Sequence, residues 1–118
     1  MNITVITHNE IAGVHCWPEA AEHCENHKYL VNPHHHTFVI ECVFAVDHVD
    51  RQIEIFDMEG EINDHLHKRY NVTYPTLCDF GANSCESIAV DIFNAFLLNG
   101  IISCTVREDG KGGACVRR

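Results

Sequence analysis

Three histidines stand at spacings that suit the binding of one metal ion. His34 and His36 flank His35, directly before a β-branched and aromatic run, 38–46, that predicts a strand. On a strand that begins before His34, the side chains of His34 and His36 point to one face, about 6–7 Å apart, and His35 points to the other. Two imidazoles placed in this way can share one cation.

A third ligand must come from elsewhere in the chain, and His15 is the best candidate. It ends the first apolar segment, which could lie beside the second strand. Three histidines and a water form the open zinc pattern, which leaves one coordination position for chemistry. The alternative is a His-rich solvated loop that binds metal adventitiously, but the strand that follows favours a site.

Length and charge limit the class of protein. A chain of 118 residues predicts a single domain, 1–118. The net charge of −9 argues against nucleic acid as a partner, because phosphate binding needs a basic surface. No apolar run approaches the roughly 20 residues that span a bilayer, so no membrane partner is expected.

Cysteine usage predicts a reduced, cytoplasmic protein. The seven cysteines are odd in number and form no repeated spacing. The first residues carry neither a basic region nor a hydrophobic signal core. We therefore expect free thiols and a cytoplasmic location.

Hydrophobic periodicity places the histidines at strand ends. Alternation from Asn2 predicts a first strand that runs towards His15, with an irregularity at Gly13. The second strand ends at a polar turn, 47–51, and the alternating segment 52–56 is expected as its hairpin partner.

The segment 18–32 is polar and has no apolar period, so a loop or a short helix is expected there. Because it connects His15 to His34, it must lie near the proposed metal. Cys24 and His27 are therefore within possible reach of the site, although a solvated loop is the default for each.

Two helices are expected in the second half of the chain. Met58, Ile62 and Leu66 recur every four residues and predict an amphipathic helix over 57–69. A connecting loop is expected over 70–82.

The second helix is expected to begin at Asn83, whose side chain would cap it with Glu86 three residues on, and to stop at Asn99-Gly100. Strands over 101–107 and 114–118 follow. The order predicts an α+β fold, an antiparallel four- to five-stranded sheet with two helices packed on one face.

The motifs, taken together, resemble the 6-pyruvoyl-tetrahydropterin synthase and 6-carboxy-tetrahydropterin synthase family over nearly the whole chain. Against the family's His-Gly-His-Asn-Tyr stands His34-His35-His36-Thr37-Phe38. Against Pro-Thr-x-Glu-Asn-Leu-Ala stands Asn83-Ser84-Cys85-Glu86-Ser87-Ile88-Ala89, and against the Glu-Thr anchor stands Glu108-Asp109.

The resemblance implies the tunnelling fold (T-fold), in which sheets of several subunits join into a barrel and a homo-oligomer forms sites between its subunits. It also implies Zn²⁺ on the three histidines named above, where the ion would bind substrate hydroxyls and ease loss of a side-chain proton. Glu108 would anchor the ring, because a carboxylate can accept two hydrogen bonds from a pterin or guanine edge. Ser84 and Glu86 in the matching motif would also bind the substrate.

The catalytic residues depart from the family pattern. The family carries a Cys shortly before His-x-His as the proton-abstracting base, but Leu30 stands four positions before His34, and the nearest upstream thiol is Cys24. The family's Asp-His pair has no counterpart, since 70–82 contains no His. A substitute relay through Cys24, His27 or Glu25 is one interpretation, because a general base needs only reach and a suitable pKa.

Three functions stay open. The leading one is a zinc-dependent carbon–oxygen lyase of tetrahydropterin or queuosine (deazapurine) synthesis, acting on a dihydroneopterin-triphosphate-like dihydropterin or a related purine-derived compound. The second is a non-catalytic protein that keeps the zinc site and binds a pterin- or guanine-like small molecule. The third is a structural metal site.

Overall fold

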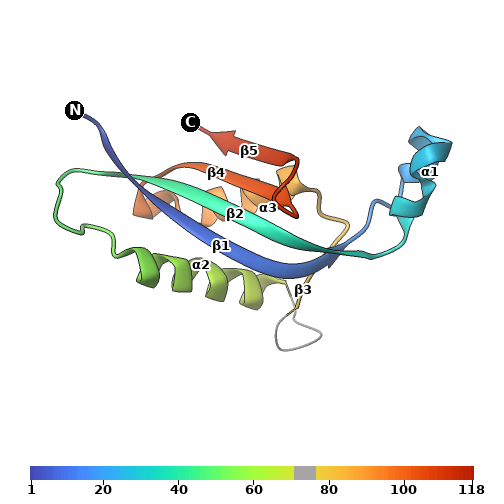
Figure 1. Ribbon diagram of the computed structural model, residues 1–118, viewed down its shortest axis with the longest axis horizontal. Helices are drawn as coiled ribbons and strands as arrows, with labels where there is room; N and C mark the ends of the chain where they lie inside the picture. Colours follow the sequence, from blue (N-terminus) through green and yellow to red (C-terminus); the bar gives the residue numbers. More distant parts are fainter. Residues whose placement is uncertain (71–76) are drawn as a thin grey trace.

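The computed structural model describes residues 1–70 and 77–118, and it confirms the α+β class (Figure 1). The sheet has the strand order β3-β1-β2-β4-β5. Its strands are β1 (Ile3–His15), β2 (His34–Val46), β3 (Cys78–Gly81), β4 (Ile101–Glu108) and β5 (Gly113–Arg117).

Two long helices accompany this sheet, α2 (Ile55–Arg69) and α3 (Cys85–Ala95). The segment expected as a loop or short helix between β1 and β2 forms α1 (Ala20–His23) and the 3₁₀ helix η1 (Glu25–Val31), and a second 3₁₀ turn, η2 (Leu97–Asn99), follows α3. Within residues 1–70 and 77–118, no helix is both long enough and apolar enough to cross a membrane.

Pairing in the sheet is antiparallel with one exception. The long strands β1 and β2 pair along their whole length, from Ile3 opposite Val46 to His15 opposite His34. Strand β2 then pairs with β4, and β4 with β5, both antiparallel. The short edge strand β3 runs parallel to β1 beside Gly13 and Val14.

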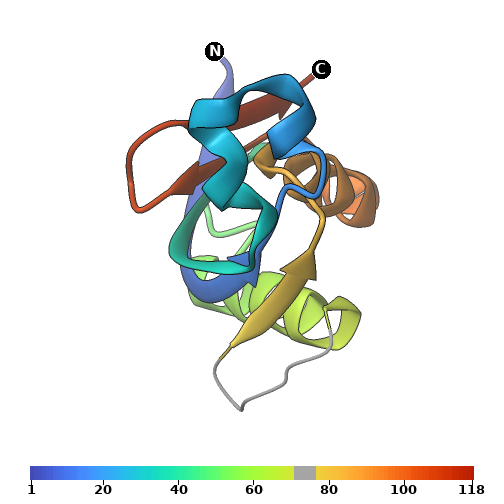
Figure 2. The same cartoon turned by 90° about the vertical axis from the view of Figure 1, so that its right-hand side faces the viewer.

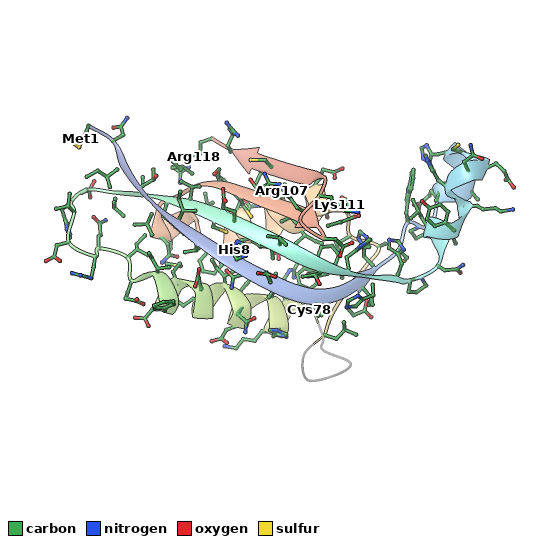
Figure 3. The ribbon with its side chains drawn as sticks, in the orientation of Figure 1. Met1, His8, Cys78, Arg107, Lys111 and Arg118 are labelled. Carbon is green, nitrogen blue, oxygen red and sulfur yellow. The ribbon has the colours of Figure 1, made fainter. Side chains whose placement is uncertain are left out.

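The core lies between the sheet and the two helices, which cover the same face (Figure 2). Alternate residues of β1 and β2 point into it, including Ile11, Phe38 and Ile40, because side chains of a strand alternate between its two faces. Helix α2 contacts β1, and α3 contacts β4 and β5. The other face of the sheet carries exposed polar residues such as His8 and Arg107 (Figure 3).

The expected helices are confirmed, with small shifts of their ends. Met58, Ile62 and Leu66 of α2 are all buried, as the four-residue recurrence predicted. Helix α3 buries Ile88 and Ile92, and it ends at Ala95, four residues earlier than expected.

The expected hairpin partner of β2 at 52–56 is wrong. Both edges of β2 are already paired, with β1 and β4, so no further strand can join it. Glu54 instead caps α2, and its carboxylate accepts a hydrogen bond from the backbone N–H of Asp57 at 2.7 Å. The alternation of Ile53 and Ile55 with polar residues thus belongs to a loop and the first turn of a helix.

The expected loop over 70–82 is also wrong in part, because Cys78–Gly81 forms β3; residues 71–76 of that expected loop lie outside the described residues. The buried ring of Phe80 packs against Gly13 of β1. A Cβ atom at Gly13 would lie 2.6 Å from Phe80 Cε2, so only glycine lets the two strands approach this closely. The pairing of β1 with β3 shifts one residue later, between Val14 and His15, close to the irregularity expected at Gly13.

Candidate metal centre

The three predicted histidines meet at one end of the sheet, on its core face. His15 is the last residue of β1, and His34 is the first residue of β2, directly opposite it. His36 lies opposite Gly13, so the period of two residues puts all three side chains on one face. One ring nitrogen from each histidine, the kind of atom that binds a metal, lies within 4.8 Å of those of the other two. The sequence prediction that these histidines come together is therefore confirmed.

Each of the three rings is oriented by a hydrogen bond at its Nδ1 atom. The partners are the backbone oxygen of Asn83 for His15 (3.0 Å), the backbone oxygen of Asn32 for His34 (2.9 Å) and the Asp109 carboxylate for His36 (2.7 Å). Carbonyl and carboxylate oxygens only accept, so each Nδ1 carries the proton and donates it. The lone pair of each ring is therefore left on Nε2, as in protein metal centres whose histidines are held by outer hydrogen bonds.

Burial favours the neutral form of His15. Its pKa is lowered from the ordinary value, chiefly by desolvation. The Asn83 carbonyl and the Glu108 carboxylate oppose this shift, and the neighbouring His34 and His36 rings add to it. A neutral imidazole with Nδ1 protonated can bind a metal ion through Nε2.

Two adjacent carboxylates at the end of β4 face this cluster. Glu108 Oε1 lies 3.2 Å from His15 Nε2, and Glu108 Oε2 lies 3.3 Å from His36 Nε2. Asp109 accepts from His36 on one oxygen and from the Thr37 backbone N–H, at 2.9 Å, on the other. The pKa of Asp109 is lowered, first by the Thr37 hydrogen bond and then by His36.

The cluster opens into a cavity of about 720 Å³. Glu86 and Ser84, at the start of α3, lie on its wall, and so do Trp17 and Lys111. Lys111 comes from the turn between β4 and β5 (Figure 3). Charged groups of both signs therefore surround the three histidines.

Ser84, and not Asn83, caps helix α3. The Ser84 hydroxyl accepts a hydrogen bond from the backbone N–H of Ser87 at 3.2 Å, so the expected cap at Asn83 is wrong by one residue. Asn83 instead uses its backbone oxygen to hold His15. Glu86 is exposed.

The buried thiol of Cys85 also lines the cavity. Cys85 donates to Glu108 Oε1 at 3.6 Å. Burial, and then the Glu108 carboxylate, raises the pKa of Cys85 to about 12, so the thiol stays protonated at neutral pH. It is therefore a poor nucleophile, although it sits in the first turn of a helix.

Cys24 and His27, the predicted catalytic residues, lie in the segment between β1 and β2. Neither belongs to the described residues that line the cavity. Cys24 is half-buried at the start of η1, and His27 is exposed, with its ring centroid 6.5 Å from that of Trp17. Their catalytic role stays a prediction.

Sequence reasoning missed the residues that orient the histidines. Two of the three hydrogen bonds use backbone oxygens, of Asn32 and Asn83, which any residue type could supply. The role of Asp109 had one signal in the sequence, because Asp109 directly follows Glu108, the predicted ring anchor. An Asp before Gly110 is, however, also typical of a turn.

A mostly antiparallel sheet with two helices packed on one face has the T-fold architecture. Among solved structures, 6-pyruvoyl tetrahydropterin synthase of Caenorhabditis elegans is similar to this chain, with a TM-score of 0.67 and 12% sequence identity. The similarity covers 100% of this chain and 96% of the nematode chain, and at this identity it establishes the fold alone. No family model matches the sequence, and no curated protein does.

Proposed function

We propose that this protein is a zinc-dependent protein of the 6-pyruvoyl-tetrahydropterin synthase and 6-carboxy-tetrahydropterin synthase kind. It would act on a dihydropterin resembling dihydroneopterin triphosphate, or on a related purine-derived compound. The observation that carries the proposal is that the three histidines present ligand atoms within 4.8 Å of one another, on rings whose Nδ1 atoms are each fixed by an acceptor. The similarity of the fold to the nematode synthase supports the substrate class.

The donor set fits zinc. Neutral imidazole nitrogens are common zinc ligands, and three of them leave a position for a further ligand. A zinc ion bound here would act as a Lewis acid towards the hydroxyl groups of a substrate side chain. His15, His34 and His36 would hold it, and Asp109 would orient His36.

The cavity suits a small planar compound. Its volume of about 720 Å³ lies in the range of small-molecule sites, about 300–1,000 Å³. The resemblance assigns the ring edge, with its N–H donors, to Glu108, and Ser84 and Glu86 to further contacts. Trp17, on the same wall, offers an aromatic face for the ring.

A second candidate is a binding protein that holds the same compound without turning it over. It is favoured by the positions of Cys24 and His27, which are outside the described lining of the cavity, and by the protonated state of Cys85. Proton abstraction needs a base within reach of the substrate. The two candidates share the metal centre and the ligand, and they differ only in product formation.

The metal centre is tested first, by elemental analysis of protein purified without a His-tag. We expect about one zinc per chain, which is lost in His34→Ala and His15→Ala. His35→Ala is the matched control, because His35 is exposed between the two ligands and belongs to the opposite face of β2. Absence of zinc from the wild type, or zinc that survives His34→Ala, would contradict the proposal.

Ligand binding and turnover are tested next. Trp17 is the single tryptophan of the chain and lines the cavity, so its fluorescence should change when a dihydropterin binds. Conversion of the dihydropterin, followed by chromatography, separates the enzyme from the binding protein. A homo-oligomer with sites between subunits is also proposed from the resemblance, and light scattering of the purified protein tests it.

A further inference from the structure

The two carboxylate oxygens of Glu108 lie close to two of the three proposed metal ligands, one oxygen to each. Its Oε1 atom is 3.2 Å from His15 Nε2, and its Oε2 atom is 3.3 Å from His36 Nε2. A residue that only anchored the far edge of a substrate ring would not need to touch the metal ligands. The position of Glu108 therefore indicates a role at the proposed metal centre itself.

Neutral histidines cannot donate to Glu108. The Nδ1 protons of His15 and His36 are already donated to the Asn83 oxygen and to Asp109, so each Nε2 presents a lone pair. A lone pair and a carboxylate oxygen at this distance repel each other unless a cation lies between them. Protonating one ring would satisfy only one of the two contacts. Protonating both would place two positive charges side by side, with ring centroids 5.3 Å apart.

The two distances match those between ligands of one tetrahedral ion. Two atoms that are each about 2.0–2.1 Å from a zinc ion, at the tetrahedral angle, lie roughly 3.3–3.4 Å from each other. Glu108 stands at this separation from one Nε2 on each side. The carboxylate is thus placed as a fellow ligand of these two histidines.

The backbone holds Glu108 in this position. It is the last residue of β4 and pairs with Phe38 of β2, two residues from His36. Its backbone N–H donates to the Gly112 oxygen at 2.9 Å, and the Cys85 thiol donates to Oε1. A ligand carried by a paired strand is held more rigidly than one carried by a loop.

We infer that Glu108 is a fourth protein ligand of the metal, which makes the ligand-free centre a His₃Glu site. This inference rests on the proposed metal centre, and it changes the role that the resemblance gives to Glu108. Glu108 would then share the metal with any substrate hydroxyl that binds there. Glu86, the other acidic residue expected to bind the substrate, also lines the cavity and would be free to contact the ring edge.

The test compares zinc affinity, measured by competition with a chromophoric chelator, in wild type, Glu108→Gln and Glu108→Asp. Loss of an outer hydrogen-bond partner typically weakens metal binding about 10–100-fold, and loss of a direct ligand should cost at least as much. We therefore expect at least a 10-fold loss in both variants. Aspartate keeps the charge but is one methylene shorter, so a purely electrostatic role would leave its affinity near that of wild type.

The matched control is Glu10→Gln. Glu10 also contacts a histidine, His8, at 3.0 Å, but on the exposed face of the sheet. The zinc affinity of the Glu10→Gln variant should therefore equal that of wild type. A second measurement replaces zinc with Co²⁺. The visible spectrum of bound Co²⁺ depends on the ligands around the ion. The spectrum should change in Glu108→Gln and not in Glu10→Gln, and melting of the metal-free proteins checks that the variants fold.

The outcomes separate this inference from the function on which it rests. If wild type binds zinc tightly and Glu108→Gln binds it equally well with the same cobalt spectrum, the inference is overturned and the three-histidine centre stands. Near-wild-type affinity in Glu108→Asp alone would also overturn it, in favour of an electrostatic role. If wild type binds no zinc, both the inference and the proposed function fail.

Discussion

Asp109 shows how a residue outside the proposed ligand set can orient one of the proposed ligands. Its carboxylate holds His36 Nδ1 at 2.7 Å and the Thr37 backbone N–H at 2.9 Å. The short contact to a histidine that would bind a cation is a charge-assisted hydrogen bond. Asp109 therefore fixes the tautomer of His36 and makes its Nε2 a stronger donor to a metal.

Replacing Asp109 with Asn should weaken zinc binding by about 10–100-fold. Asp109 has a positive φ of 56°, which asparagine also tolerates, so the turn should be kept. Asp109 accepts from His36 and Thr37 on two different oxygens, and asparagine offers one oxygen and one NH₂ group in their place. An amide N–H facing His36 would oppose the required tautomer. Competition with a chelator measures the change.

Asp50→Asn is the control for that substitution. Asp50 is exposed in the segment between β2 and α2, where it pairs with Arg51, and its loss should not alter zinc affinity. Equal affinities in Asp109→Asn and wild type would show that His36 is oriented without the carboxylate.

At the scale of elements, the close parallel pairing of β1 with β3 positions the end of β1, where His15 lies. A Cβ at Gly13 would meet Phe80 at 2.6 Å and Phe38 at 3.0 Å, and both rings are buried. Gly13→Ala should therefore destabilise the fold by about 1–3 kcal/mol, the usual cost of overpacking. It should also weaken zinc binding, because His36 lies opposite Gly13. Urea unfolding measures the first effect.

Gly60→Ala is the matched control for Gly13→Ala. Gly60 lies inside α2 and is exposed, and nothing lies within 4 Å of an added Cβ. Alanine is favoured over glycine inside helices by about 0.8–1.0 kcal/mol, so this variant should be more stable than wild type. A loss of stability at Gly60, or none at Gly13, would contradict the packing argument.

The elements with a clear period were predictable from sequence. The strands β1, β2 and β4 and the helices α2 and α3 follow from alternation or from a three-to-four-residue recurrence, because each buries one face. Strand β3 was missed because its four residues are too few to show a period, and its partner lies more than sixty positions away in the chain. The cap at Glu54 was missed because the alternating residues around it are typical of a strand.

The candidate site was predictable where it depends on strand geometry. His34 and His36 share a face because a strand has a period of two, and His15 joins them through the register of β1 and β2. The groups that orient the rings were not predictable, because the backbone oxygens of Asn32 and Asn83 leave no signature in residue type. The approach of Glu108 to Nε2 depends on the pairing of β4 with β2, which sequence alone does not fix.

At the scale of the whole molecule, buried acids that titrate in the alkaline range should make the fold sensitive to high pH. Burial, followed by the contact with Asp91, raises the pKa of Tyr70 to about 12. Burial raises the pKa of Cys78 to about 11. Both groups keep their protons in the folded state at a pH where the unfolded chain has lost them.

The free energy of unfolding should therefore be unaffected by Tyr70 below about pH 10 and should fall as pH rises towards about 12. Urea unfolding of wild type and Tyr70→Phe at a series of pH values tests this. The variant loses the hydrogen bond to Asp91 and should be less stable at pH 8 by about 0.5–1.5 kcal/mol. Its further loss between pH 10 and 12 should be smaller than that of wild type, and parallel curves would contradict the assignment to Tyr70.

Metal binding should stabilise the entire domain, because the centre joins segments that are far apart in the chain. The ligands lie at the end of the β1–β2 pair that residues 16–33 connect, and Asn83 and Asp109, which orient His15 and His36, lie much further along the chain. An ion that binds the folded state alone, at 100 times its dissociation constant, adds about 2.7 kcal/mol. For a domain of this size the melting temperature should then rise by roughly 5–15 °C on addition of zinc and fall again with a chelator. The rise should vanish in His34→Ala and persist in His35→Ala, and an equal rise in both variants would mean that zinc binds elsewhere on this histidine-rich chain.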